Sequence, residues 1–137
     1  MSTFSADLER WVRKSERRME AVVKQSAQAV IEIVQTPQAK GGKMPVDTGF
    51  LRNTGVIALN TAPSGPAKAD EGDAGEWDIS SITLTINDVE IGDTIVFGWS
   101  AVYARKMEER YGFAQSAAMQ WPSIVAVNAN ELRTRIL

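Results

Sequence analysis

The sequence predicts an α+β fold: a long N-terminal helix, a small antiparallel β-sheet, and a short helix and a C-terminal helix packed on that sheet. Apolar residues recur with helical spacing in the first quarter of the chain, alternate with polar residues in the middle, and return to helical spacing near the end. The chain has 137 residues, which fits a single domain spanning residues 1–137.

The first element is expected to be a helix over residues 5–34. Ser5 fits the N-cap position, and Pro37 pushes Thr36 out of helical geometry and so ends the helix. A helix of this length measures roughly 45 Å, which exceeds the width of a domain of this size. Part of it is therefore expected to project, or to pack against another chain. Its apolar positions are Phe4, Leu8, Trp11, Val12, Met19, Val22, Val23, Ala27, Val30, Ile33 and Val34.

Three strands are expected in the middle of the chain. The first covers residues 55–61, and two more, at 82–87 and 95–99, alternate apolar and polar side chains and form a hairpin. Segment 38–44 is polar, contains a Gly-Gly pair and is expected to be a flexible linker. Segment 62–78 has no periodicity and is expected to be a long mobile loop.

Two helices are expected to close the fold. The first covers residues 101–111, with Gly112 as its C′ residue, because glycine adopts the left-handed conformation that ends many helices. The last runs from about 122 to 135, with Pro122 in the first turn, where proline is tolerated.

Composition excludes several kinds of site. The chain contains no cysteine and no histidine, so Ser-His-Asp and Cys-His catalysis and conventional zinc sites are not available. We therefore predict neither a metal nor a cofactor. The charged first twenty residues do not resemble a signal peptide, and no apolar run approaches the roughly 18 residues of a membrane span. A soluble protein of a cytosol-like compartment, with no membrane contact, is expected.

Charge is distributed unevenly along the chain. Residues 1–44 carry 8 basic and 5 acidic side chains, a net charge of +3. Residues 45–99 carry 2 basic and 9 acidic side chains (−7), and residues 100–137 carry 5 basic and 3 acidic ones (+2). A polyanion such as DNA is expected to avoid the middle third and to tolerate the two ends.

Asp47-Thr48-Gly49 raises one enzymatic hypothesis, because this triplet carries the catalytic carboxylate of aspartic proteases. Such an enzyme needs two carboxylates that share a proton, so this chain would act as a retropepsin-like dimer with Asp47 from each copy. The context argues against it, since Pro45 and the Gly-Gly linker stand where a strand should deliver the carboxylate. A long N-terminal helix also has no role in an all-β protease.

A structural interpretation of the same segment is favoured. Pro45 holds the preceding residue extended, and Asp47 is expected to accept hydrogen bonds from backbone amides two or three residues later. This cap would begin a short helical turn that carries Leu51 inward. Gly49 would permit a close backbone approach, and Arg52 would project towards a carboxylate or a neighbouring chain.

Three short motifs follow one another along the chain. The first is Pro45-Val46-Asp47-Thr48-Gly49-Phe50-Leu51-Arg52-Asn53, the second combines Val102-Tyr103-Ala104 with Glu109-Arg110-Tyr111-Gly112-Phe113, and the third is Ala118-Met119-Gln120-Trp121. In this order they resemble the tail-component or tail-completion proteins of long-tailed bacteriophages, which act at the head–tail junction. That family has Pro-Val-Asp-Thr-Gly-x-Leu-Arg, a strand ending in Tyr-Ala, a Glu-rich turn and a last helix. The resemblance covers residues 1–137.

The resemblance implies a non-enzymatic structural virion protein, a tail-completion, terminator or neck ring subunit that joins the tail to the capsid connector. The implied partners are further copies of the chain in a ring, often a hexamer, together with connector or stopper proteins and the tail tube protein. The implied location is the neck or tail of the virion, assembled in the cytoplasm of the bacterial host.

In such a ring, the acidic part of segment 62–78 is hypothesised to face the channel and to keep passing DNA from sticking. The alternative is a solvated, disordered loop. The acidic residues concerned are Asp70, Glu71, Asp73, Glu76 and Asp78.

A DNA-binding module is the remaining alternative, because the first helix carries basic side chains that can bind phosphates. Glu9, Glu16 and Glu20 interleave with them at spacings that allow pairing along the helix, which is typical of a solvated face. The basic residues are Arg10, Arg13, Lys14, Arg17, Arg18 and Lys24. Expected interface residues are Trp11, Arg17, Trp77, Tyr103 and Glu109.

Overall fold

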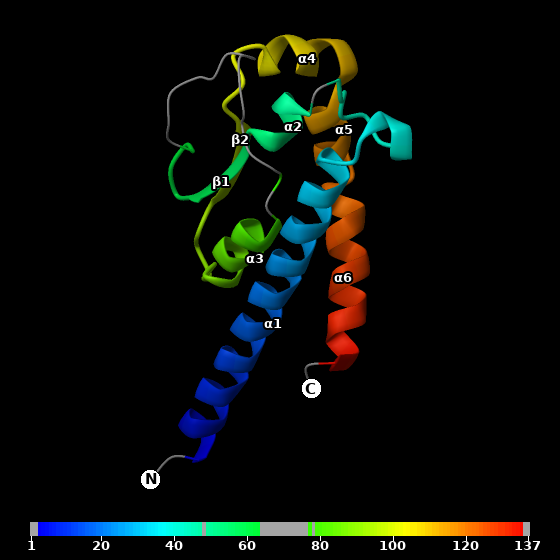
Figure 1. The fold of residues 1–137 in the computed structure, drawn as a ribbon. Helices are drawn as coiled ribbons and strands as arrows, with labels where there is room; N and C mark the ends of the chain where they lie inside the picture. Colours follow the sequence, from blue (N-terminus) through cyan, green and yellow to red (C-terminus); the bar gives the residue numbers. More distant parts are fainter. Residues whose placement is uncertain (1–2, 48, 64–76, 78, 136–137) are drawn as a thin grey trace.

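The computed structural model describes residues 3–47, 49–63, 77 and 79–135 (Figure 1). The predicted α+β class is confirmed, with one long helix, a two-stranded antiparallel sheet and several shorter helices. Among the described helices, none is long and apolar enough to cross a membrane. In chain order the elements are α1 (Thr3–Val34), a 3-10 turn (Gln38–Lys40), α2 (Phe50–Asn53), β1 (Gly55–Leu59), α3 (Ile79–Asn87), β2 (Ile95–Trp99), α4 (Ala104–Tyr111), α5 (Phe113–Met119) and α6 (Trp121–Arg135).

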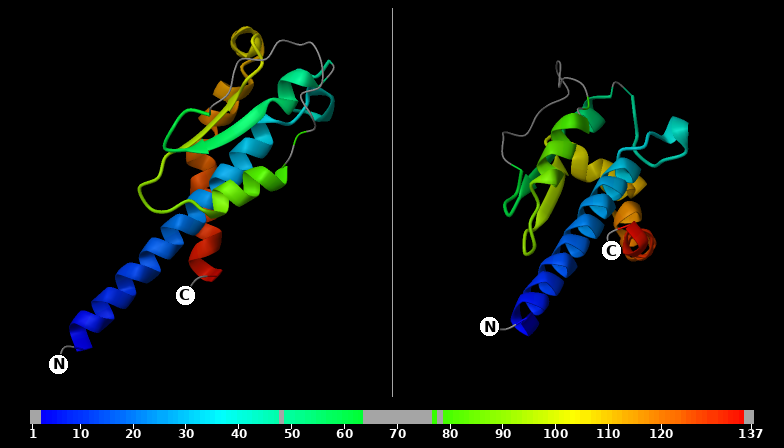
Figure 2. Two further views of the ribbon diagram at one scale, coloured as in Figure 1. Left: turned by 60° about the vertical axis from the view of Figure 1, so that its left-hand side comes forward. Right: turned by 90° about the horizontal axis from the view of Figure 1, so that it is seen from below.

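Helix α1 is the axis of the fold. The sheet and α3 lie on one side of it, and α6 crosses it on the other side (Figures 1 and 2). The crossing contains a buried polar chain: Gln25 Nε2 donates to Asn128 Oδ1 at 3.0 Å, and Asn128 Nδ2 donates to Ser26 Oγ at 3.0 Å. Residues 3–13 lie beyond this crossing and are all exposed, so the prediction that part of the helix projects is confirmed.

One prediction for the middle of the chain is wrong. Residues 82–87, expected to form a strand, are part of helix α3. Ile82 and Ile86 are buried against α1, while Leu84 between them is 67% exposed. A strand would place all three side chains on one face, whereas a helix separates Leu84 from the other two. Contact with α1 therefore overrides the strand preference of these β-branched residues.

The sheet accordingly pairs β1 with β2 in antiparallel register, from Gly55 opposite Trp99 to Leu59 opposite Ile95. The expected hairpin between 82–87 and 95–99 is wrong for the same reason as the strand at 82–87. β1 ends before the expected position 61, because Asn60 adopts a positive φ of 63°.

Segment 38–44 folds back onto the end of α1 and is not an extended linker. The amide of Gln38 donates to the Met44 carbonyl at 3.0 Å, and the Met44 amide donates to the Thr36 carbonyl at 3.2 Å. Met44 is fully buried in the core. Its side chain therefore anchors a loop whose polar sequence alone indicates a linker.

The C-terminal part contains one helix more than expected. Gly112 ends α4 at φ 63°, as predicted, and α5 begins directly after it. The Glu108 carboxylate accepts from the Ala114 and Gln115 amides at 2.7 and 2.9 Å. It thus satisfies two amides that the first turn of α5 leaves without helical partners.

Four aromatic rings connect the two parts of the core. Trp77, Phe97, Trp99 and Phe113 contact one another edge to face, with centroid separations of 5.9, 5.2 and 4.9 Å in that order. Edge-to-face contact is a favoured arrangement of aromatic pairs. Phe97 packs against both buried clusters, so the row of rings joins the α1–α3 contact to the α4–α5 region.

Gln35, only 1% exposed, joins three elements through hydrogen bonds. Its side-chain nitrogen donates to the Arg52 carbonyl at 2.8 Å, and its side-chain oxygen accepts from the Trp99 indole at 2.9 Å. Arg52 Nε donates to the Gln35 carbonyl at 2.7 Å. A Cβ at Gly55 would lie 2.7 Å from Gln35 Nε2, so glycine also makes room for this network.

The network yields a test by substitution. Replacing Gln35→Ala removes the hydrogen-bond partner of the Trp99 indole and one partner of the Arg52 carbonyl, and it leaves a cavity where the buried side chain lay. We expect the unfolding free energy to fall by about 2–4 kcal/mol. Urea unfolding followed by circular dichroism measures this change, with the exposed Gln115→Ala as the matched control. Equal stabilities of the two variants would contradict the role assigned to Gln35.

Candidate functional site

The segment that resembles the phage signature, residues 45–53, forms a bend followed by helix α2. Gly49 has a φ of 86°, a left-handed conformation that costs little only for glycine. Among the described residues, a Cβ there would meet only Asn53 Nδ2, at 3.5 Å, so the backbone conformation, rather than a close approach, requires the glycine. Leu51 is buried in the core, as predicted, and Pro45 is half-buried.

The expected role of Asp47 is wrong. Its side chain is exposed, and among the described residues it makes no hydrogen bond to the amide of Gly49 or Phe50. The bend therefore depends on the conformation of Gly49 and the burial of Leu51, and not on a carboxylate cap. Thr48 lies outside the described residues.

Arg52 contacts residues of its own chain. Besides its hydrogen bond to Gln35, its guanidinium lies 5.9 Å from the centroid of the Trp77 ring. This geometry fits a cation–π contact. The structure thus brings Arg52 and Trp77 together as part of the core support.

The remaining expected interface residues separate into two regions. Tyr103 is half-buried at the start of α4, with its ring 6.4 Å from that of Phe50, and Glu109 is exposed and pairs with Arg105 at 3.8 Å. Trp11 and Arg17 are exposed on the other side of the molecule, on α1.

The acidic residues expected to face a channel, Asp70, Glu71, Asp73, Glu76 and Asp78, lie outside the described residues.

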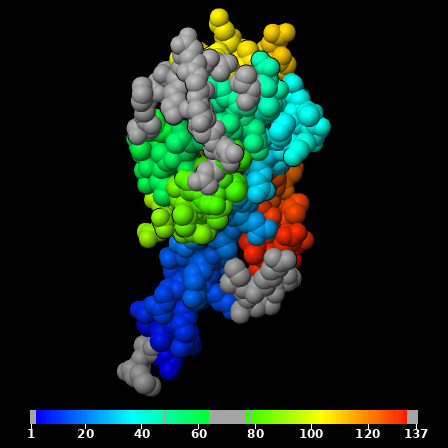
Figure 3. Space-filling view, in the orientation of Figure 1, coloured from blue at the N-terminus to red at the C-terminus, as the bar shows by residue number. Residues whose placement is uncertain are grey.

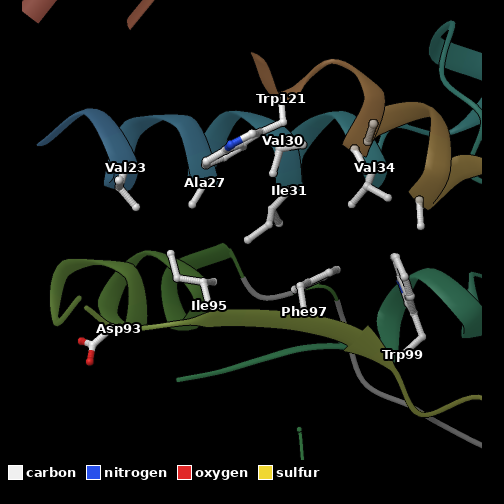
Figure 4. Close-up of a pocket in the computed structure, with 13 residues that line it drawn as sticks. Val23, Ala27, Val30, Ile31, Val34, Asp93, Ile95, Phe97, Trp99 and Trp121 are labelled. Atoms are coloured by element: carbon white, nitrogen blue, oxygen red, sulfur yellow. The ribbon is translucent and has the colours of Figure 1, made fainter. Parts of the chain in front are cut away.

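An apolar groove of about 590 Å³ opens beside α1. It is bounded by α1, by β2 and by the junction of α5 with α6, and the aromatic side chains point into it (Figure 4). Asp93 lies at one end of the groove and is its one charged side chain among the described residues. The lining includes Val23, Ala27 and Val30 from α1, Ile95 and Phe97 from β2, and Trp121. We call this surface the apolar groove.

A second apolar surface lies on the projecting part of α1. Phe4 and Trp11 are 75% and 65% exposed, and Leu8 between them is also exposed. Their spacing of four and three residues places them on one face of the helix. Figure 3 shows that this part of α1 stands clear of the packed body. We call these three residues the apolar stripe.

Sequence reasoning placed Phe4, Leu8 and Trp11 among the apolar positions of the helix and named Trp11 as an interface residue, but it missed Gln35, Glu108 and the groove. Gln35 reads as an ordinary polar residue at a helix end, and its partners are 17 and 64 positions away. The groove joins segments that are adjacent only after folding. The cap of α5 alone had a local signal in the sequence, because Glu108 lies only six residues before Ala114, whose amide it accepts from.

The bend yields a paired prediction. Gly49→Ala should lower the unfolding free energy by roughly 1–2 kcal/mol, because alanine at positive φ is strained. Asp47→Ala should leave it nearly unchanged, since the carboxylate is exposed. Chemical denaturation of both variants checks this. If Asp47→Ala lowered the unfolding free energy as much as Gly49→Ala does, Asp47 would have the capping role after all.

Comparison with known proteins offers no further guide to this site. Protein-family models, curated proteins and solved structures all give no match to the chain. The resemblance to phage tail-completion proteins therefore stays a prediction.

Proposed function

We propose that this protein is a non-enzymatic structural subunit of a phage head–tail junction, a ring-forming neck or tail-completion protein. The observation that carries an assembly role is the projecting part of α1, which holds Phe4, Leu8 and Trp11 in solvent beyond a packed body. Large exposed apolar surfaces mark sites of interaction with other molecules. The phage setting comes from the resemblance of three motifs along the chain, the first of which is residues 45–53.

The geometry of the signature segment fits this proposal better than it fits a protease. Gly49 and Leu51 shape the bend, and Arg52 is bonded to Gln35, so the signature has a structural use in this fold. An aspartic protease instead needs a buried, shared pair of carboxylates. Asp47 is exposed on a turn that precedes a helix, which favours the structural interpretation.

The DNA-binding alternative finds less support. Arg10 pairs with Asp7, and Arg13 lies 3.9 Å from Glu9, so acidic neighbours partly neutralise the basic face of α1. Exposed pairs of this kind are weak but lower the local positive potential. A solvated helix face explains the same residues.

Several features of the proposal follow from the resemblance alone. They are a ring of like subunits, often a hexamer, with connector or stopper proteins on one side and the tail tube on the other. Virion location and passage of DNA through the ring belong to the same proposal. The hypothesis of a channel-facing acidic loop stays with them.

Deletion of the gene from a particle-producing strain tests the function. We expect DNA-filled heads and separate tails in electron micrographs, because the junction lacks one component. The wild-type gene supplied in trans, and a Leu84→Ala version with an exposed residue changed, should both restore joined particles. Joined, infectious particles in the deletion strain would contradict the proposal.

A further inference from the structure

We propose that the apolar stripe of one copy binds in the apolar groove of a second copy of this chain. The contact is head to tail, because each molecule contributes a different surface to each of its two neighbours. It deepens the proposed ring role by naming the surfaces that join the subunits. The argument for the contact itself rests on the described surfaces and not on the phage setting.

The stripe has the form of a helix that binds in a groove. Phe4, Leu8 and Trp11 follow the i, i+4, i+7 pattern by which an amphipathic helix inserts anchors into an apolar cleft. Trp11 is the largest anchor, and tryptophan is enriched among residues that dominate binding energy. Residues 3–13 are all exposed, so Phe4, Leu8 and Trp11 are accessible to a partner.

The groove offers what such anchors require. Its floor comes from α1 through Ala27 and Val30, and its sides come from Phe97 on β2 and from Trp121 at the start of α6. The space of about 590 Å³ exceeds the volume of one tryptophan side chain. Filling it would bury aromatic and aliphatic surface on both partners.

The stripe of a molecule cannot reach the groove of the same molecule. Trp11 and Val23, which lines the groove, belong to the same unbroken helix. Their separation of 12 residues corresponds to about 18 Å along the axis. The stripe therefore stays outside the groove of its own molecule. Every second copy of the chain carries the same groove and can receive the stripe.

Charge supports the same pairing. Residues 3–18 carry five basic and three acidic side chains, a net charge of +2. The one charged side chain that lines the groove, among the described residues, is the acidic Asp93. The backbone amide of Glu90 and the side chain of Asn60 bond to Asp93 and lower its pKa, so Asp93 is ionised at neutral pH. A cationic helix thus approaches an acidic end of the groove.

Two complementary variants test the contact. The stripe variant, Leu8→Glu with Trp11→Glu, keeps an intact groove. The groove variant, Ala118→Arg, keeps an intact stripe and places a long charged side chain into the groove from an exposed position. Leu84→Glu on α3 is the matched control, since it adds an acidic residue at an exposed apolar site away from both surfaces.

Sedimentation velocity at high micromolar concentration measures the oligomeric state of each variant and of their mixture. Wild type and Leu84→Glu should form oligomers, and each complementary variant alone should be monomeric. Their equimolar mixture should form a 1:1 dimer and nothing larger, because only one stripe–groove pair remains. A monomeric wild type, or a groove variant that associates like wild type, would overturn the inference. The latter result would indicate stripe-to-stripe pairing.

Cross-linking provides a second readout that does not depend on the Arg side chain. Because the chain has no cysteine, Val12→Cys and Ala118→Cys, made in separate copies, introduce one thiol each beside the stripe and the groove. Oxidation of the mixture should give a disulfide-linked heterodimer. Products that link only position 12 to position 12 would contradict the contact. Oligomers that persist in the stripe variant would overturn this contact while leaving the proposed function, which the gene deletion tests separately, intact.

Discussion

The buried side chain of Gln35 holds together the end of α1, helix α2 and strand β2. Its amide satisfies the Arg52 carbonyl and the Trp99 indole, and Arg52 in turn bonds to the Gln35 carbonyl. Each of these groups would be costly to bury without a partner. The signature segment, the sheet and the long helix consequently take one relative position, and the aromatic row from Trp77 to Phe113 packs around it.

That fixed body explains the division of α1 into two parts. Its C-terminal half is covered by the sheet, α3 and α6, with Ser26 and Asn128 paired inside the α1–α6 crossing. Its N-terminal part continues as the same helix into solvent, so the body aims the apolar stripe in a defined direction. A rigid, directed surface costs less entropy to bind than a flexible arm, which suits a subunit that assembles with copies of itself.

Sequence periodicity predicted the long helix, β2, α4 with its Gly112 end, and α6, because apolar spacing in these segments agrees with their packing. It failed at 79–87, where β-branched residues indicate a strand but Ile82 and Ile86 pack on α1 as a helix. It missed α5, whose start depends on the Glu108 carboxylate. In the site, the burial of Leu51 was predicted from the local pattern, whereas Gly49 was expected for a close backbone approach and is required instead by its positive φ. The roles of Asp47 and Arg52 were not predictable, because contacts with distant residues decide where those side chains lie.

The most direct measurement of the central claim is hydrogen exchange of the tryptophan indoles, followed by NMR and assigned with Trp→Phe variants. If Gln35 binds the Trp99 indole in the core, that N–H should exchange as slowly as buried amides of α1. The exposed indole of Trp11 in the same molecule serves as the internal reference. Exchange of Trp99 as fast as that of Trp11 would contradict the account.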